Sequence, residues 1–465
     1  NTRLVGSEMC IRDRIKNTPA DGLITGLSYV NSDLFAKEQT KTAIMHYDYM
    51  VLAGTQGINN HKKLDRMIDV IRGLKVPLIF FCEGGGGRPG DVDAGDQNIA
   101  GLNIPSFHDF ARLSGEVPLV GIGSGRLFAG NAALLGCCDV IIGTRDLNLG
   151  MGGPAMIEGG GLGVYKPEEV GPTSVQYPNG VIDILVDNED DAIVIAKKYL
   201  SYFQGNLGSW EAPEVENLRY VIPENRLEVY DIREVIDNIA DIGSVLEIKA
   251  GFAKGMFTGF IRVKGKPLGL IANNPLFLAG AIDSDGADKA SRFIKLCENY
   301  NIPILSLCDT PGMMVGPEIE ETGLVRHCCR LFLAGANVTV PMMTIVLRKA
   351  YGLGAQAMAG GSFMAPQFVV GWPTAEIGAM GLEGAVKLGY RKELEAESDV
   401  EKKEKLFKKL VDDLYEKGKA INAASLLEFD TVLDPIESRD WISMVAESPI
   451  DSSEKVPKNR YIDSW

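Results

Sequence analysis

Short apolar runs and helical stretches alternate along most of the chain. Two of the apolar runs are 76–81 (VPLIFF) and 302–307 (IPILSL), and a turn rich in glycine or proline follows each of them. Each run comes after a stretch whose apolar residues recur at helical spacing, 62–75 in one case and 288–300 in the other. A continuous apolar run between turns is typical of a buried strand, and strands that alternate with helices predict an α/β fold with crossover connections.

This pattern occurs twice. The stretch that starts at Arg66 (RMIDVIRGLKVPLIFFCEGGGG) aligns with the one that starts at Arg292 (RFIKLCENYNIPILSLCDTPGM), and further along 117–130 (VPLVGIGSGRLFAG) aligns with 340–354 (VPMMTIVLRKAYGLG). A long repeat in only two copies indicates a pair of homologous domains rather than a solenoid.

We expect the domains to span 20–225 and 226–465, because the segment 210–226 between them is polar and marked by proline. Residues 1–19 are left unassigned. The opening residues, ending in GSEMCIRDR, show no period, and we interpret them as an artefact of the sequence that lies outside the fold.

Composition narrows the class of protein. The chain is 45% hydrophobic, contains no uninterrupted apolar run of membrane-spanning length, and does not start with a secretory signal, so we expect a soluble cytoplasmic protein. Its net charge of -15 argues against nucleic acid or a membrane as the main partner. Eight scattered cysteines without a C-x-x-C spacing and only four histidines indicate reduced thiols and no metal site.

The glycine-rich turns are the candidate chemistry. Glycine lets a ligand approach the main chain, so backbone N–H groups at such turns can stabilise the charge that develops on a carbonyl oxygen. The alternative is that these glycines only permit tight turns. The basic residues Arg126, Arg348 and Lys349 are either a cationic rim for an anionic ligand or solvated cations at helix starts. Neither a dinucleotide G-x-G-x-x-G nor a phosphate-binding G-x-x-x-x-G-K-[ST] motif is present.

Several motifs resemble those of a known family. The segments 309–327 (DTPGMMVGPEIEETGLVRH), 339–354 (TVPMMTIVLRKAYGLG) and 372–386 (WPTAEIGAMGLEGAV) are similar to the carboxyltransferase component of biotin-dependent acyl-CoA carboxylases. The N-terminal half matches more faintly, at 83–91 (EGGGGRPGD) and 125–139 (GRLFAGNAALLGCCD). The resemblance covers roughly residues 20 to 445. It implies two tandem homologous crotonase-like (ClpP/crotonase) domains with ββα units.

The resemblance also implies the reaction. An enzyme of this family, of the acetyl-CoA or propionyl-CoA carboxylase type, moves a carboxyl group from carboxybiotin to the α carbon of an acyl-CoA thioester. The enolate and the biotin ureido group are each held by a backbone oxyanion hole, one per domain, and no side-chain base or metal is needed. The implied partners are a biotin carboxyl carrier, a biotin carboxylase and further copies of the chain, commonly in a hexamer.

By the same resemblance, each domain contributes its own set of site residues. Those expected at the thioester carbonyl are Gly87, Ala129 and Gly130, and those expected at the ureido oxygen are Gly312, Leu353 and Gly354. Further contacts to biotin or CoA are expected from Gly85, Gly86, Arg126, Met313, Tyr351 and Gln356. Three positions depart from the family pattern: Ala129 replaces a glycine, Leu353–Gly354 replaces Gly-Ala, and Gln356 occupies a position related to acyl length.

Other functions stay open at this point. A biotin-dependent decarboxylase or transcarboxylase subunit would carry out the same half-reaction. An enoyl-CoA hydratase or isomerase would share the fold but needs a side-chain acid or base, for which Glu83 is the candidate, although it could equally cap the turn at the end of its strand. A non-catalytic scaffold would have no reason to retain glycine turns in both halves.

Overall fold

The chain folds as two compact units, each built around its own β-sheet. The computed structural model describes residues 3–4, 18–88, 91, 102–448 and 461–463. The first unit comprises Asn1–Leu207 together with Ile248–Phe252 and Pro457–Trp465, and the second comprises Gly208–Glu247 and Ala253–Val456. The segment 210–226 therefore belongs to the second unit, and the boundary between 225 and 226 stays a prediction.

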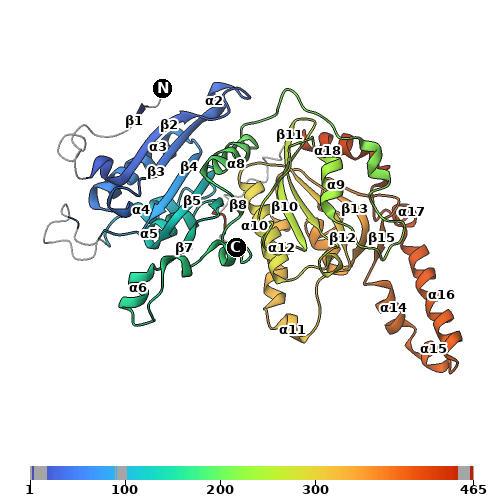
Figure 1. Cartoon of the computed structure of the whole chain (residues 1–465). Helices are drawn as coiled ribbons and strands as arrows, with labels where there is room; N and C mark the ends of the chain where they lie inside the picture. Colours follow the sequence, from blue (N-terminus) through green and yellow to red (C-terminus); the bar gives the residue numbers. More distant parts are fainter. Residues whose placement is uncertain (1–2, 5–17, 89–90, 92–101, 449–460, 464–465) are drawn as a thin grey trace. The chain divides into compact units, whose positions relative to one another are not determined.

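The sheet of the first unit has the strand order β1-β2-β3-β4-β5-β6-β8, with β7 paired to β5 (Figure 1). Its strands are β1 (Arg3–Leu4), β2 (Leu23–Tyr29), β3 (Lys41–Tyr47), β4 (Leu78–Gly84), β5 (Leu119–Phe128), β6 (Val140–Thr144), β7 (Asn148–Gly150) and β8 (Ile184–Val186). The pairs β1–β2 and β2–β3 are antiparallel, and the others are parallel.

Helices connect and cover these strands. They are α2 (Lys37–Thr40), α3 (Ile58–Leu74), α4 (Ser106–Ala111), α5 (Ala129–Gly136), α6 (Pro154–Gly159), α7 (Thr173–Gln176) and α8 (Glu189–Ser201). The apolar stripe of α3, including Leu64, Ile68 and Ile71, packs in one core with the buried strand residues Leu78 and Phe80. The helix at 62–75 and the strand at 76–81 are thus confirmed within a few residues.

The second sheet repeats this topology in the order β16-β14-β13-β12-β11-β10-β9, with β15 paired to β13. Its strands are β9 (Leu246–Glu247), β10 (Met256–Val263), β11 (Lys266–Asn273), β12 (Ile304–Thr310), β13 (Met342–Tyr351), β14 (Phe368–Gly371), β15 (Glu376–Gly378) and β16 (Thr431–Val432). Strands β9 to β11 pair antiparallel and the rest pair parallel. Two homologous α/β units with ββα elements are therefore confirmed.

The helices of the second unit include an extension that has no counterpart in the first. They are α9 (Ile232–Ile239), α10 (Ser284–Asn299), α11 (Pro317–Glu320), α12 (Leu324–Ala336), α13 (Gly352–Met358), α14 (Leu382–Gly389), α15 (Arg391–Ala396), α16 (Val400–Gly418), α17 (Ala420–Ser425) and α18 (Ser438–Ala446). In Figure 1, α14, α15 and α16 project from the body of this unit. A small apolar cluster that contains Leu382, Val386 and Val411 joins them to Tyr351, at the end of β13.

The described part of the chain holds seven free cysteines. Among the same residues, no helix is long and apolar enough to cross a membrane.

Candidate active site

In each unit, the turn after one strand touches the start of the helix after the next. A Cβ atom added to Gly86 would lie 2.7 Å from the Ala129 Cβ and 2.7 Å from the Gly130 nitrogen. In the second unit, a Cβ added to Gly354 would lie 2.7 Å from Gly312 Cα. Real Cβ atoms do not approach so closely, so glycine is required for the approach itself. The structure thus brings the two predicted turns of each unit together.

The duplicated bridges show where the N–H groups of the first turn point. Gln56 pairs with Gly87 through two hydrogen bonds, from the Gln56 nitrogen to the Gly86 oxygen (2.6 Å) and from the Arg88 nitrogen to the Gln56 oxygen (2.8 Å). In a parallel bridge of this kind, the N–H of the central residue points away from the pairing strand. The Gly87 N–H has no backbone acceptor within the described residues.

The second unit builds the same bridge one residue beyond the predicted glycine. Ile282 pairs with Met313, through bonds from its nitrogen to the Gly312 oxygen (3.1 Å) and from the Met314 nitrogen to its oxygen (2.8 Å). The structural counterpart of Gly87 is therefore Met313, whereas Gly312 corresponds to Gly86. The second N–H of this kind therefore belongs to Met313, which the repeat aligns with Gly87, although the family resemblance assigned the role to Gly312.

A left-handed residue opens the helix in both units. Ala129, the first residue of α5, has φ 54°, and Gly352, the first residue of α13, has φ 55°. The next residues, Gly130 and Leu353, lie in the first turn, where N–H groups lack an intrahelical acceptor. Each unit thus offers two outward-facing donors, one from the strand turn and one from the helix start, an arrangement that can hold an oxyanion.

In each unit, a second segment with left-handed backbone packs against the end of the strand that leads into the turn. Leu52, Ala53 and Gly54 have φ values of 50°, 55° and 64°, and the sequence-equivalent Leu278, Ala279 and Gly280 have 50°, 51° and 86°. A Cβ on Gly54 would lie 2.9 Å from the Glu83 oxygen. Left-handed backbone costs a non-glycine residue about 1–2 kcal/mol. Both copies nevertheless retain it at a leucine and an alanine, which points to a supporting role for this segment in each site.

Polar side chains tie the first turn to its surroundings. The Asn131 amide, fully buried at the start of α5, donates to the Gly54 oxygen (3.0 Å) and the Glu83 oxygen (2.6 Å). Arg88, just after the turn, forms an ion pair with Asp21 (2.7 Å) and donates to the Thr55 oxygen (2.9 Å). Sequence reasoning missed both residues. The only signal was their position within the two motifs that resemble the family.

The basic residue expected at the rim of the second site is buried instead. Arg348 is 2% exposed, and its Nε donates to the fully buried Asp309 (3.0 Å). Asp309 also accepts from the Tyr230 hydroxyl (2.8 Å) and the Lys349 backbone nitrogen (3.1 Å). Burial, with the neighbouring Asp309 carboxylate, holds the pKa of Tyr230 well above its ordinary value. Arg348 is thus neither a solvated cation nor a ligand rim, because it neutralises a carboxylate inside the unit.

Of the remaining predicted residues, some are exposed to solvent and others are buried. Arg126 is exposed and pairs with Glu168 (2.8 Å), and Gly85 is exposed on the turn. Tyr351 is 2% exposed, and its hydroxyl donates to Glu376 (2.7 Å) beneath the second helix start, so its side chain faces the interior. Burial and the Glu376 carboxylate raise the pKa of Tyr351.

Gln356 is exposed on α13 and lines a cavity of about 810 Å³ in the second unit. The cavity is bounded by α13, by the strand β15 and by the helices α14, α16 and α17. Much of its lining is apolar, and its larger apolar side chains are Phe363, Met364, Ile377, Met380, Leu382, Leu414, Leu426 and Leu427.

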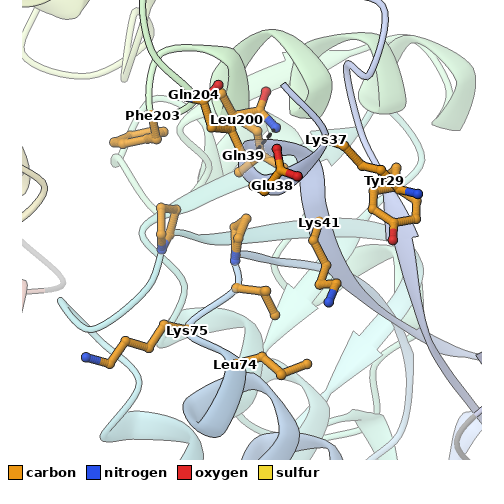
Figure 2. Close-up of a pocket in the computed structure, with 13 residues that line it drawn as sticks. Tyr29, Lys37, Glu38, Gln39, Lys41, Leu74, Lys75, Leu200, Phe203 and Gln204 are labelled. Atoms are coloured by element: carbon orange, nitrogen blue, oxygen red, sulfur yellow. Dashed lines mark hydrogen bonds between the residues drawn. The ribbon is translucent and has the colours of Figure 1, made fainter. Parts of the chain in front are cut away.

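A different pocket, of about 610 Å³, lies in the first unit, at the amino-terminal ends of β4 and β5 and therefore away from the turn that follows β4. Figure 2 shows Lys37, Lys41 and Lys75 around it, and Pro77 and Pro118, which precede β4 and β5, are also in its lining. Helices α3 and α8 end here, and helix C-termini carry partial negative charge that favours cations. The C-terminus of α3 therefore accounts for Lys75, which directly follows it, whereas the Lys37 ammonium lies 5.1 Å from the centroid of the Tyr29 ring. The pocket contains none of the predicted site residues.

The two homologous crotonase-like units match the architecture of solved carboxyltransferases, which indicates the class of the protein. The family model of the carboxyl transferase domain matches residues 9–461, so the chain belongs to that family. It is 32% identical to the methylmalonyl-CoA carboxyltransferase 12S subunit of Propionibacterium freudenreichii subsp. shermanii, over 92% of this chain and 81% of that one. These findings support acyl-CoA carboxyltransferase activity.

Solved structures agree. A single-chain, multi-domain long-chain acyl-CoA carboxylase is 53% identical with a TM-score of 0.88, and the match covers 93% of this chain but only 42% of that one. The transcarboxylase 12S hexamer, solved with methylmalonyl-CoA and methylmalonic acid bound, is 29% identical with a TM-score of 0.82, covering 96% of this chain and 86% of that one.

Proposed function

We propose that this chain transfers a carboxyl group between carboxybiotin, carried by a partner, and the α carbon of an acyl-CoA thioester. The observation that carries the proposal is the duplicated approach of a strand turn to a helix start in a member of the carboxyl transferase family. Two oxygens become more negative in this reaction, one on the thioester and one on the ureido group of biotin. Two equivalent anion sites on one chain match that requirement.

The donors assigned to the thioester oxygen are the N–H groups of Gly87 and Gly130, with Ala129 setting the direction of the helix start. In the second unit the equivalent donors are Met313 and Leu353, assigned to the ureido oxygen. The glycines Gly85, Gly86, Gly312 and Gly354 shape the turns and permit their close approach. Carboxybiotin would supply both the CO₂ and the base for the α proton, so the residues of this chain have only to bind and orient.

The partners follow from the reaction. A biotin carboxyl carrier must present the biotin, and a biotin carboxylase must load it, either as separate chains or as domains of one polypeptide; one solved relative is a single-chain, multi-domain acyl-CoA carboxylase. Copies of this chain are the third partner, since the solved transcarboxylase 12S core is a hexamer. We assign the reaction to the cytoplasm.

The substrate is proposed to be an acyl-CoA with a chain longer than propionyl. The apolar cavity beside Gln356, the position that the family resemblance relates to acyl length, supports this choice. The 53% identity to a long-chain acyl-CoA carboxylase points the same way. A large apolar lining stabilises each buried methylene by about 0.8 kcal/mol, so affinity should rise with chain length until the cavity is filled.

The test is decarboxylation of 2-carboxyacyl-CoA esters with free biotin as acceptor, from malonyl-CoA to long-chain homologues. We expect kcat/KM to rise with chain length, and Gln356→Trp to remove the preference while malonyl-CoA turnover persists. Equal kcat/KM across the series would contradict the substrate proposal. Hydration of crotonyl-CoA without biotin-dependent turnover would favour the hydratase alternative, which requires a side-chain acid or base at the thioester.

A further inference from the structure

Each unit has a carboxylate near the end of a central strand, Glu83 in β4 and Asp309 in β12, and the surroundings of these two carboxylates differ. Glu83 and Asp309 are equivalent: each follows a buried cysteine, and in each sheet the register shifts at that point, between Cys82 and Gly84 or between Cys308 and Thr310. Asp309 is fully buried and accepts three hydrogen bonds, one of them from Arg348. Its negative charge is therefore neutralised where it stands.

Glu83 has no such partners. The position equivalent to Arg348 in the first unit is Gly125, and a Cβ on that glycine would overlap Glu83 Oε1. The glutamate side chain therefore fills space that the arginine occupies in the second unit. Within the residues that the structure describes, no hydrogen bond or ion pair to the Glu83 carboxylate is found.

Three carboxylates act electrostatically on Glu83. Glu189, from α8, accepts from Ser124 (2.7 Å), Asp146 accepts from Thr144 (2.5 Å), and Asp48 accepts from the Met50 nitrogen (2.9 Å). The nearby cation, Arg126, pairs with Glu168 and interacts with Tyr49. Partial burial, followed by repulsion from Glu189, Asp146 and Asp48, raises the pKa of Glu83 to about 7.

The backbone of Glu83 belongs to the support of the first anion site. Its carbonyl oxygen accepts from Asn131 at the helix start and lies against Gly54, and its chain leads directly into the turn that carries Gly87. The Glu83 carboxylate lies against Gly125, and Glu83 precedes Gly87 by four residues, so a negative charge on this side chain belongs to the residue from which the donor-carrying turn starts. It would oppose the oxyanion that those donors are arranged to stabilise.

We infer that Glu83 is a positioning residue whose neutral form supports the first anion site and whose ionised form weakens it. The inference rests on the proposed function. It predicts that carboxyl transfer at the first site loses rate as the pH rises through neutrality, while the second site, where Arg348 neutralises Asp309, contributes no such dependence. The side chain exchanges its proton with solvent and takes no part in the covalent steps.

The experiment compares wild type with Glu83→Gln in biotin-dependent decarboxylation between pH 6 and 8.5. The glutamine variant keeps the neutral form at every pH, so the ratio of its kcat to that of wild type should rise with pH, on the order of three- to tenfold. Glu189→Gln removes a repelling charge and so lowers the pKa of Glu83. When the two kcat values are compared in the Glu189→Gln background, the rise in their ratio should therefore occur at lower pH. His108→Gln, at an exposed histidine whose ring pairs with the neighbouring Asp109, is the control and should follow wild type.

Thermal melting over the same pH range tests the ionisation without any assay of activity. A carboxyl whose folded-state pKa is raised contributes its stability below its ordinary pKa and loses it as the pH rises through the folded-state value. The melting temperature of Glu83→Gln minus that of wild type should therefore increase between pH 5 and 8. A constant kcat ratio in an active enzyme would overturn the inference while leaving the proposed function intact. If wild type showed no biotin-dependent turnover, the proposed function would fail, and a constant melting difference would then overturn the ionisation of Glu83 as well.

Discussion

Removing one backbone donor at the second site is the sharpest test of the assigned geometry. Leu353→Pro deletes the N–H that follows the left-handed Gly352, and the leucine side chain is 62% exposed, so little packing is lost. Proline is accommodated in the first turn of a helix, where the missing N–H has no intrahelical acceptor. The helix α13 should therefore persist while the anion site loses one of its two donors.

The expected loss follows from the type of interaction. Removing one oxyanion-hole donor typically lowers kcat by about 10²–10³, which is about 2.7–4 kcal/mol of transition-state stabilisation. Leu353→Ala is the matched control, because it truncates the same side chain and keeps the N–H. We expect Leu353→Ala to stay within about threefold of wild type in the biotin-dependent assay and Leu353→Pro to fall by about 10²-fold or more.

The first site needs a different control. A Cβ on Gly130 would lie 2.5 Å from Gln56 Oε1 and 3.1 Å from Phe107 Cζ, so any substitution there also disturbs packing. Gly130→Ala carries that disturbance and retains the donor, and the ratio of Gly130→Ala to Gly130→Pro isolates the N–H. Equal kcat values for proline and alanine variants at both sites, with folding intact by circular dichroism, would refute the assignment of these donors.

The remaining predictions concern the buried Arg348 and the glycines of the first turn. Arg348→Met leaves Asp309 buried without its cation and should lower the free energy of unfolding by about 3–5 kcal/mol in urea titrations, whereas a loss below about 1 kcal/mol would mean that the pair is not buried as described. Gly87→Ala meets open space, so it should leave the melting temperature unchanged while raising KM for acyl-CoA, because the methyl group projects where the substrate is proposed to lie. Gly86→Ala instead strikes Ala129 and should lower both stability and kcat; equal melting temperatures for the two alanine variants would argue against the close approach of the turns.

The repeat made much of this architecture predictable from sequence. The alignment of Arg66 with Arg292 fixed the order of helix, buried strand and turn in both halves, because strand and helix patterns have different periods. The residues that the resemblance groups into one site do come together, and the two turns approach each other at Gly86 in the first unit and at Gly354 in the second.

Other features depend on tertiary contacts that a single sequence does not display. Arg348 precedes a glycine turn and has the sequence context of a ligand-binding cation, yet the shift of register between β12 and β13 turns it toward Asp309. The family resemblance gave Gly312 the role of Gly87, whereas the hydrogen bonds of Ile282 make Met313 the equivalent residue, in agreement with the register of the repeat. The left-handed Leu52 and Ala53 carry no residue-type signal at all, because neither residue favours positive φ.

Biotin-dependent decarboxylation of malonyl-CoA by the purified chain tests the central claim most directly. The account predicts release of acetyl-CoA that requires free biotin and saturates with it, since a second anion site is built into the chain to receive the ureido group. Release at the same rate with and without biotin, or no release from any 2-carboxyacyl-CoA, would contradict the account.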